Sequence, residues 1–212
     1  MISANPDHQT KMSTVEPHRD DLGSKIGMWL FIFTELLLFG GLFLVYAVFR
    51  YKNAVAFHLA AEELSVIVGT VNTVILLVSS MTVAMSITAL QLGQRKRSMT
   101  LLVITLVLAL VFMINKYFEW SEKISHQIYP GSQLLTEFGN GEVMFFGLYY
   151  AMTGLHALHI IIGMIILLVV LFRIKSNKIN IGNHIHLENG ALYWHLVDLI
   201  WIFLFPLFYL IA

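Results

Sequence analysis

Five long apolar segments limit the fold of this chain more than any other feature. They lie at roughly residues 26–48, 64–90, 100–120, 143–172 and 190–211. Each is long enough to cross about 30 Å of hydrocarbon at about 1.5 Å per helical residue. Backbone groups inside hydrocarbon must form their hydrogen bonds within their own segment, so each segment is predicted to be a helix. The sequence therefore predicts an all-α, polytopic membrane protein built as a bundle of five transmembrane helices.

The composition excludes several classes of protein. Of the 212 residues, 58% are hydrophobic and only 12% are charged, whereas about a quarter of the residues in a soluble domain are charged. So few charged residues cannot cover the whole surface of a protein of this size. Lipid must therefore cover much of that surface. The formal net charge is zero, which argues against nucleic acid as a partner. The absence of cysteine excludes disulfides, thiolate metal sites and cysteine nucleophiles.

The chain divides into a tail and a membrane domain. Residues 1–25 are polar and contain Pro6 and Pro17, and they lack the apolar core and cleavage site of a secretory signal. We predict an N-terminal tail over residues 1–25 and one five-helix membrane domain over residues 26–212, with no separate soluble domain.

The distribution of lysine and arginine predicts the orientation of the bundle. If the N-terminus is cytoplasmic, three cations fall outside, namely Arg50, Lys52 and Lys123. Nine then fall inside: Lys11, Arg19, Lys25, Arg95, Lys96, Arg97, Arg173, Lys175 and Lys178. Cytoplasmic segments carry the excess of lysine and arginine. The sequence therefore predicts a cytoplasmic N-terminus and a C-terminus outside.

Ionisable side chains within the spans are the candidate functional residues, because charge at membrane depth is costly. They are Glu35 in the first span, His156 and His159 in the fourth, and Glu188, His195 and Asp198 in the fifth. Helical spacing places the two histidines of the fourth span on one stripe and the three residues of the fifth on another. The second span carries small or polar residues, most of them on one side: Gly69, Asn72, Thr73, Ser79, Ser80 and Ser86. The simplest arrangement turns these three faces toward one another.

Three interpretations of this cluster remain open from the residues alone. A buried histidine bonded to a carboxylate on another helix fixes helix register. Alternatively, Glu35 and its neighbours handle protons or ions. Thirdly, His156-x-x-His159 resembles part of a carboxylate–histidine metal site, although the paired Glu-x-x-His elements of such sites are missing. His184 and His186 form a His-x-His pair that is expected to lie in a solvated loop. No soluble catalytic motif is present.

Several segments together resemble subunit III of cytochrome c oxidase, the haem–copper oxidase subunit III family. The two most specific are Thr153–Gly163, a Thr-Gly segment with two histidines, and Glu188–Trp201, which holds Tyr-Trp-His followed by Asp. Three others are Gly27–Glu35, which ends on the glutamate, Val71–Ser80, which holds Asn-Thr and Ser-Ser, and Tyr117–Trp120. The resemblance runs from about Lys25 to the C-terminus, in order through all five spans.

The resemblance implies an accessory, non-redox subunit of a terminal oxidase that passes electrons from cytochrome c or quinol to oxygen and pumps protons. The chain would stabilise subunit I, its main contact, which holds the haems and copper, so neither a cofactor nor a metal is expected in this chain. The resemblance implies no catalysis by the chain alone. It does imply bound phospholipid. Glu35 matches a buried protonatable position that supports proton uptake. An interhelical polar network with lipid contacts is implied for His156, His159, Glu188, His195, Asp198, Asn72 and Glu119.

The chain departs from the family in two ways. Many members have seven helices, and the two that are missing here form one wall of a lipid cleft. The short form implies the cytoplasmic membrane of a bacterium or archaeon. Lys116 stands where the family tends to be uncharged.

Three alternatives remain. One is an accessory subunit of a nitric-oxide reductase system. Another is a small proton-coupled transporter, although such proteins usually show internal repeats and broken helices, and no repeat occurs here. The third is a stand-alone membrane metalloenzyme.

Overall fold

The computed structural model describes residues 21–132, 135, 139–177, 179 and 184–211, and the regular structure within these ranges is entirely helical. In chain order the helices are α1 (Asp21–Lys52), α2 (Ala54–Glu62), α3 (Val66–Gln91), α4 (Arg95–Ser125), α6 (Asn140–Lys175) and α7 (Ile185–Tyr209). All of these except α2 are long and apolar enough to cross a membrane. The predicted all-α membrane fold with five spans is confirmed.

The helix ends differ from the predicted spans for a simple reason. Helices α1, α4 and α6 extend at both ends beyond their apolar segments, because helical hydrogen bonding does not stop where hydrocarbon ends. Helix α1 already begins at Asp21, and residues 1–20 of the predicted tail lie outside the described residues. Helix α2 was not predicted, since its nine residues are far too few to cross a membrane.

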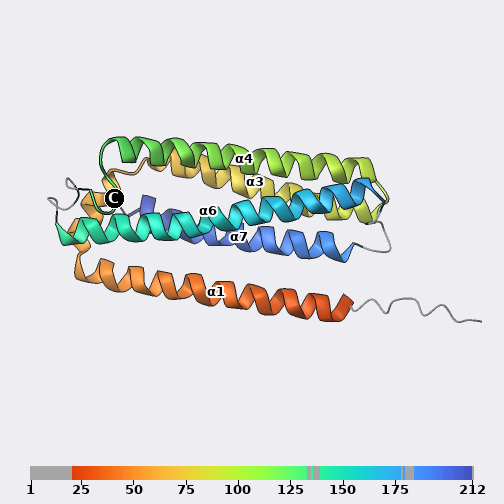
Figure 1. The fold of residues 1–212 in the computed structure, drawn as a ribbon, viewed down its shortest axis with the longest axis horizontal. Helices are drawn as coiled ribbons and strands as arrows, with labels where there is room; N and C mark the ends of the chain where they lie inside the picture. The colour runs from red at the N-terminus through yellow and green to blue at the C-terminus, as the bar shows by residue number, and fades with distance from the viewer. Residues whose placement is uncertain (1–20, 133–134, 136–138, 178, 180–183, 212) are drawn as a thin grey trace, which may run out of the picture.

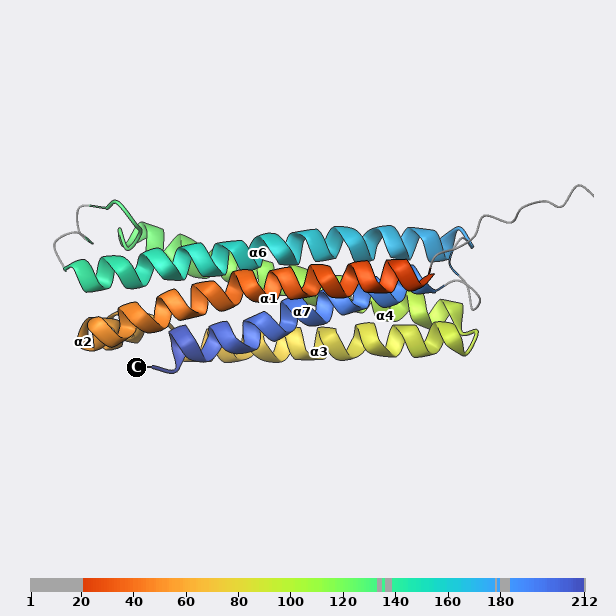
Figure 2. The ribbon, with the colours of Figure 1, turned by 90° about the horizontal axis from the view of Figure 1, so that it is seen from below.

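Helix α7 lies at the centre of the bundle and α1 at its edge. In Figure 1, α3 and α4 lie on one side, α6 and α7 in the middle, and α1 on the opposite side; Figure 2 shows the same helices from below. Over the most apolar stretch of each helix, 56% of the residues of α7 are buried but only 6% of those of α1. Helix α1 therefore leaves most of its apolar surface free for lipid or another chain.

Four edge-to-face aromatic rings join α1 and α2 to the bundle at one end. Tyr46 lies 5.5 Å from Phe57 and 5.1 Å from Phe208, and Phe145 lies 5.4 Å from Phe57 and 5.6 Å from Phe208, measured between ring centroids. All four residues have 0% exposed surface. The Tyr46 hydroxyl also donates to the carbonyl of Leu207. Aromatic pairs in this geometry are worth about 0.5–1.5 kcal/mol each beyond burial, so this end of α1 is firmly held.

Polar contacts join the helices at the opposite end. The Arg95 guanidinium donates to the Asn177 side chain and to the carbonyl of Lys175, which ties the α3–α4 turn to the end of α6. The Asn189 amide donates to the Ser24 hydroxyl at 2.9 Å, which ties α7 to α1. The start of α1 and the end of α7 therefore lie at opposite ends of the bundle (Figure 1).

Candidate functional site

Glu35 of α1 and His159 of α6 form an ionisable pair at membrane depth. His159 Nε2 lies 2.9 Å from Glu35 Oε2, and the side chains are 9% and 15% exposed. His159 Nδ1 lies 2.8 Å from the carbonyl of Leu155, and a carbonyl can only accept, so Nδ1 carries a hydrogen. The contact is then either imidazolium to carboxylate or neutral imidazole to carboxylic acid. In both forms one proton is shared between Glu35 and His159.

His195 of α7 pairs with α3. Its Nδ1 lies 2.6 Å from the Ser80 hydroxyl. Asp198, one turn further along α7, is 6% exposed, and its Oδ1 has no hydrogen-bond partner among the described residues. The two residues thus share a helix face, as their spacing predicted, but neither contacts Glu35 through a described hydrogen bond.

His156 lies apart from the Glu35–His159 pair, although it is less than one turn away on α6. It is 1% exposed, and neither ring nitrogen has a hydrogen-bond partner among the described residues. Its ring stacks on Trp201 at 5.3 Å and meets Phe112 edge-on at 6.0 Å between centroids. His156 is therefore held by aromatic packing between α4 and α7.

Helix α3 receives the indole N–H groups of α7 on its small polar face. Trp194 Nε1 donates to the Ser79 hydroxyl and Trp201 Nε1 to the Thr73 hydroxyl, both at 3.0 Å. Asn72 accepts a 2.9 Å hydrogen bond from the Asn115 amide of α4. The small and polar residues of the second span thus meet two tryptophans and an asparagine, and spacing within single spans did not predict these partners.

A buried cluster around Glu119 of α4 joins this residue of the implied polar network to partners that were not predicted. Glu119 Oε1 accepts from Lys116 Nζ at 3.2 Å, from the Tyr209 hydroxyl at 2.5 Å and from the Tyr149 hydroxyl. Lys116 is 4% and Glu119 8% exposed, and Lys116 Nζ lies 5.3 Å from the centre of the Trp201 ring. The resemblance pointed to Glu119, and the spacing of three places Lys116 beside it on the helix, but nothing in the sequence indicated Tyr149 and Tyr209 as its partners.

Glu188 lies at the start of α7, near the surface. Its carboxylate contacts His184 at 3.0 Å and Lys25 of α1 at 3.3 Å, and the Lys25 side chain is 52% exposed. Exposed ion pairs contribute about 0–1 kcal/mol. Glu188 thus helps to position the ends of α1 and α7 and is not part of the membrane-depth contacts.

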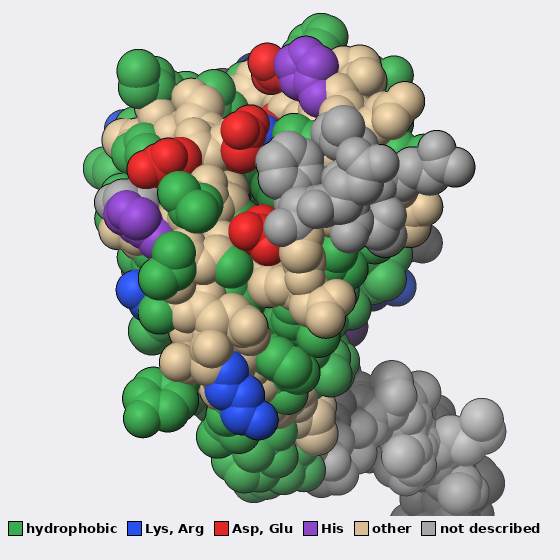
Figure 3. Space-filling view, turned by 90° about the vertical axis from the view of Figure 1, so that its left-hand side faces the viewer, with side chains coloured by type: hydrophobic (Ala, Val, Ile, Leu, Met, Phe, Trp, Pro, Cys, Tyr) green, Lys and Arg blue, Asp and Glu red, His purple; other side chains and the backbone are tan. Residues whose placement is uncertain are grey.

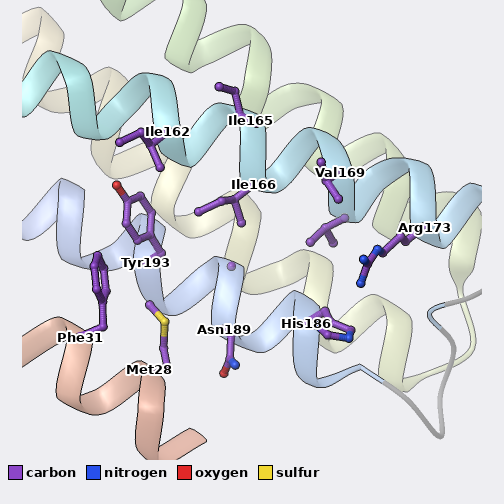
Figure 4. A pocket seen from close by; sticks show the side chains of 12 residues that line it. Met28, Phe31, Ile162, Ile165, Ile166, Val169, Arg173, His186, Asn189 and Tyr193 are labelled. Carbon is purple, nitrogen blue, oxygen red and sulfur yellow. The ribbon is translucent and has the colours of Figure 1, made fainter. Parts of the chain in front are cut away.

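An apolar groove of about 480 Å³ opens between α1, α6 and α7. Figure 4 shows Met28 and Phe31 of α1 across from Ile162 and Ile166 of α6, with Arg173 and His186 at the far end. An acyl chain can lie along such a surface while the guanidinium of Arg173 meets an anionic headgroup.

No described residues form a group of three or more metal-binding side chains close enough to hold an ion. His159 contacts the carboxylate of Glu35, whereas His156 has no hydrogen-bond partner among the described residues. The contacts around Glu35 and His159 are suited to holding and exchanging a proton.

Comparisons with known proteins agree with one another. The family described as cytochrome c oxidase subunit III matches residues 11–212. "Cytochrome c oxidase subunit 3" of Yarrowia lipolytica is 35% identical over 88% of this chain and 67% of the relative. "Probable cytochrome c oxidase subunit 3" of Rickettsia bellii is 31% identical over 93% of this chain and 72% of the relative. "Cytochrome c oxidase subunit 3" of Thermostichus vulcanus is 29% identical over 88% of this chain and 87% of the relative.

Proposed function

This chain belongs to the cytochrome c oxidase subunit III family, and we propose that it serves its oxidase by packing against subunit I and supporting proton uptake. Membership makes it an accessory membrane subunit of a haem–copper oxidase, in a family whose redox cofactors sit in other subunits. The family match over residues 11–212 carries this conclusion. It favours the oxidase over the nitric-oxide reductase and transporter alternatives.

The proposed contact with subunit I rests on the free apolar surface of α1. Trp29, Leu37 and Leu44 are 61%, 60% and 67% exposed on this helix. The test is purification through this chain in mild detergent, followed by a haem spectrum and identification of the accompanying chains. Co-purification of subunit I with its haems is expected, and crosslinks from the Trp29 position should reach it. Recovery of the chain alone, without haem-bearing partners, would contradict the proposal.

We propose that the Glu35–His159 pair is the protonatable element through which the chain supports proton uptake. The support is the single proton that the two groups share at 2.9 Å and the partial exposure of Glu35 at the edge of the bundle. A proton held between two side chains can be released to, or taken from, an adjoining hydrogen-bonded path.

Replacing Glu35 by glutamine is expected to leave assembly intact while lowering oxidase turnover or hastening its loss during turnover. Glutamine keeps a neutral hydrogen bond to His159, so the free energy of unfolding should change by less than about 1.5 kcal/mol. Oxygen consumption by the purified complex, followed over time and across pH, is the measurement. The matched control is Glu188→Gln near the surface. Kinetics identical to wild type at every pH would rule out the proton role.

We also propose that phospholipid occupies the apolar groove, with its headgroup at Arg173. The support is the combination of an apolar lining with one guanidinium at its end. Phospholipid analysis of the purified complex tests this, because Arg173→Gln should reduce the retained anionic lipid. Equal retention in both preparations would contradict it.

The proposed location is the cytoplasmic membrane of a bacterium or archaeon, with the N-terminus inside. The short relative from Thermostichus vulcanus, 87% of which is aligned, supports the five-helix form. Because the chain has no cysteine, single cysteines report sidedness cleanly. An impermeant thiol reagent applied from outside is expected to label Gln127→Cys and to leave Asn177→Cys unlabelled until the membrane is opened. The reverse pattern would invert the orientation.

A further inference from the structure

One oxygen of the buried Glu119 carboxylate lacks a donor. Lys116, Tyr149 and Tyr209 all donate to Oε1, whereas Oε2 is buried and has no hydrogen-bond partner among the described residues. Buried carboxylate oxygens are normally satisfied, because leaving one without a donor is costly. None of the described residues supplies this donor, so Oε2 can accept one from a ligand.

Glu119 lines a groove between the start of α3 and the end of α4, which we call the α3–α4 groove. Its volume is about 460 Å³, and its polar lining includes Glu63, Glu122, Lys123 and His126. Its mouth lies where α4 ends and α3 begins, at one end of the membrane-spanning bundle. The groove is thus large enough for a small polar group and is placed at the level of a membrane surface.

The charges around the α3–α4 groove favour a cation. The carboxylates of Glu63, Glu119 and Glu122 face two ammonium groups, those of Lys116 and Lys123. Lys116 is already bonded to Glu119, and Lys123 donates to the backbone carbonyl of Glu63. One negative charge is left unbalanced when His126 is neutral. Figure 3, which looks onto this end of the molecule, shows acidic side chains gathered there.

The other side of the α3–α4 groove is apolar and exposed. Ile67, Val71 and Phe118 line it and are 77%, 47% and 65% exposed. In a membrane these side chains lie against acyl chains. A ligand that suits both sides carries a cationic, hydrogen-donating head and a hydrophobic tail.

We propose that the α3–α4 groove binds the headgroup of an aminophospholipid, with its primary ammonium donating to Glu119 and Glu122. An –NH₃⁺ group has three donors and a full positive charge, so it satisfies Glu119 Oε2 and balances the spare carboxylate. The lipid phosphate then faces Lys123 and His126. A choline headgroup has no N–H to donate, and a glycerol headgroup brings negative charge without a cation. A metal ion fits less well, because the described residues offer no group of three ligands.

The experiment uses the intact oxidase complex in phosphatidylcholine nanodiscs that contain a trace of phospholipid with a photoreactive acyl chain. The probe carries an ethanolamine, choline or glycerol headgroup in parallel samples. After irradiation, mass spectrometry measures labelling of the peptides that contain Val71 and Phe118. The ethanolamine probe is expected to label these peptides about tenfold more than the choline probe, the effect of one charge-assisted hydrogen bond.

Two variants locate the binding site, and one serves as control. Glu122→Gln removes a carboxylate at the mouth and Val71→Trp fills the α3–α4 groove; each should reduce ethanolamine-probe labelling severalfold. Glu62→Gln changes a carboxylate that is 60% exposed and outside the groove, so labelling should stay at the wild-type level. Unchanged haem content shows that the complex is assembled, which separates this result from any failure of the accessory-subunit role.

Three outcomes would overturn the proposal. Equal labelling by all three probes would mean that no headgroup is recognised. Preference for the glycerol probe would mean that the groove recognises an anion. Preference for ethanolamine that survives both Glu122→Gln and Val71→Trp would place the binding elsewhere on the chain.

Discussion

Replacing Glu119 by leucine is expected to lower the free energy of unfolding by about 3–5 kcal/mol, the usual cost of leaving one partner of a buried ion pair uncompensated. The change leaves the Lys116 ammonium, which is only 4% exposed, without its counter-ion. It also removes the acceptor shared by the hydroxyls of Tyr149 and Tyr209. The hydroxyls of Tyr149 and Tyr209 still accept from Lys116 Nζ at 3.1 Å and 2.8 Å, and their rings lie 5.0 Å and 5.5 Å from it, but none of these neutral groups replaces the negative charge of Glu119.

Reversible unfolding of the purified chain or complex in mixed micelles measures this loss. The double variant Lys116→Met/Glu119→Leu should recover part of the stability, because it leaves no unpaired buried charge, although the hydroxyls of Tyr149 and Tyr209 still lack the acceptor that Glu119 provides. Glu62→Leu, at an exposed carboxylate, is the matched control and should change stability by less than about 0.5 kcal/mol. A single-variant loss no larger than that of this control would show that the Lys116–Glu119 pair does not matter for folding.

Replacing Gly163 by leucine is expected to cost about 2–3 kcal/mol or more, because it overpacks the contact between α6 and α7. A Cβ at this position would lie 2.9 Å from Trp194 Cε3 and 3.2 Å from Tyr193 Cε1. Trp194 is 1% exposed and bonded to Ser79, so its ring cannot swing away freely. The helices must separate, and that strains the 3.2 Å hydrogen bond from the Tyr193 hydroxyl to the carbonyl of His159.

The same unfolding assay, with tryptophan fluorescence as a second signal, tests this prediction. Gly147→Leu on the same helix is the control, because nothing lies within 4 Å of a Cβ built there. That control should be neutral or slightly stabilising, since leucine favours a helix over glycine by about 0.8 kcal/mol. If both variants behaved alike, close approach of α6 and α7 at Gly163 would not be needed for stability.

The choice of candidate residues was possible from sequence, but the choice of their partners was not. Charge at membrane depth singled out Glu35, His159 and His195, and the structure gives each of them a polar contact on another helix. The spacing of His156 and His159 placed both on one helix face. His156 nevertheless has aromatic neighbours and no hydrogen bond among the described residues. Glu35 was a candidate without a predicted partner, and the structure pairs it with His159.

The sequence by itself determined the class of fold, because lipid allows only segments that satisfy their own backbone, and five segments are long and apolar enough. It also determined the family, through motifs in all five spans. Only the tertiary structure decided the helix neighbours, the short helix α2 and the burial of Lys116 against Glu119, Tyr149 and Tyr209. The physical reason is that periodicity fixes the face and depth of a side chain on its own helix. The rotation and order of the helices depend on packing contacts between helices throughout the bundle, such as the contact of Gly163 with Trp194. These contacts cannot be predicted from any single segment.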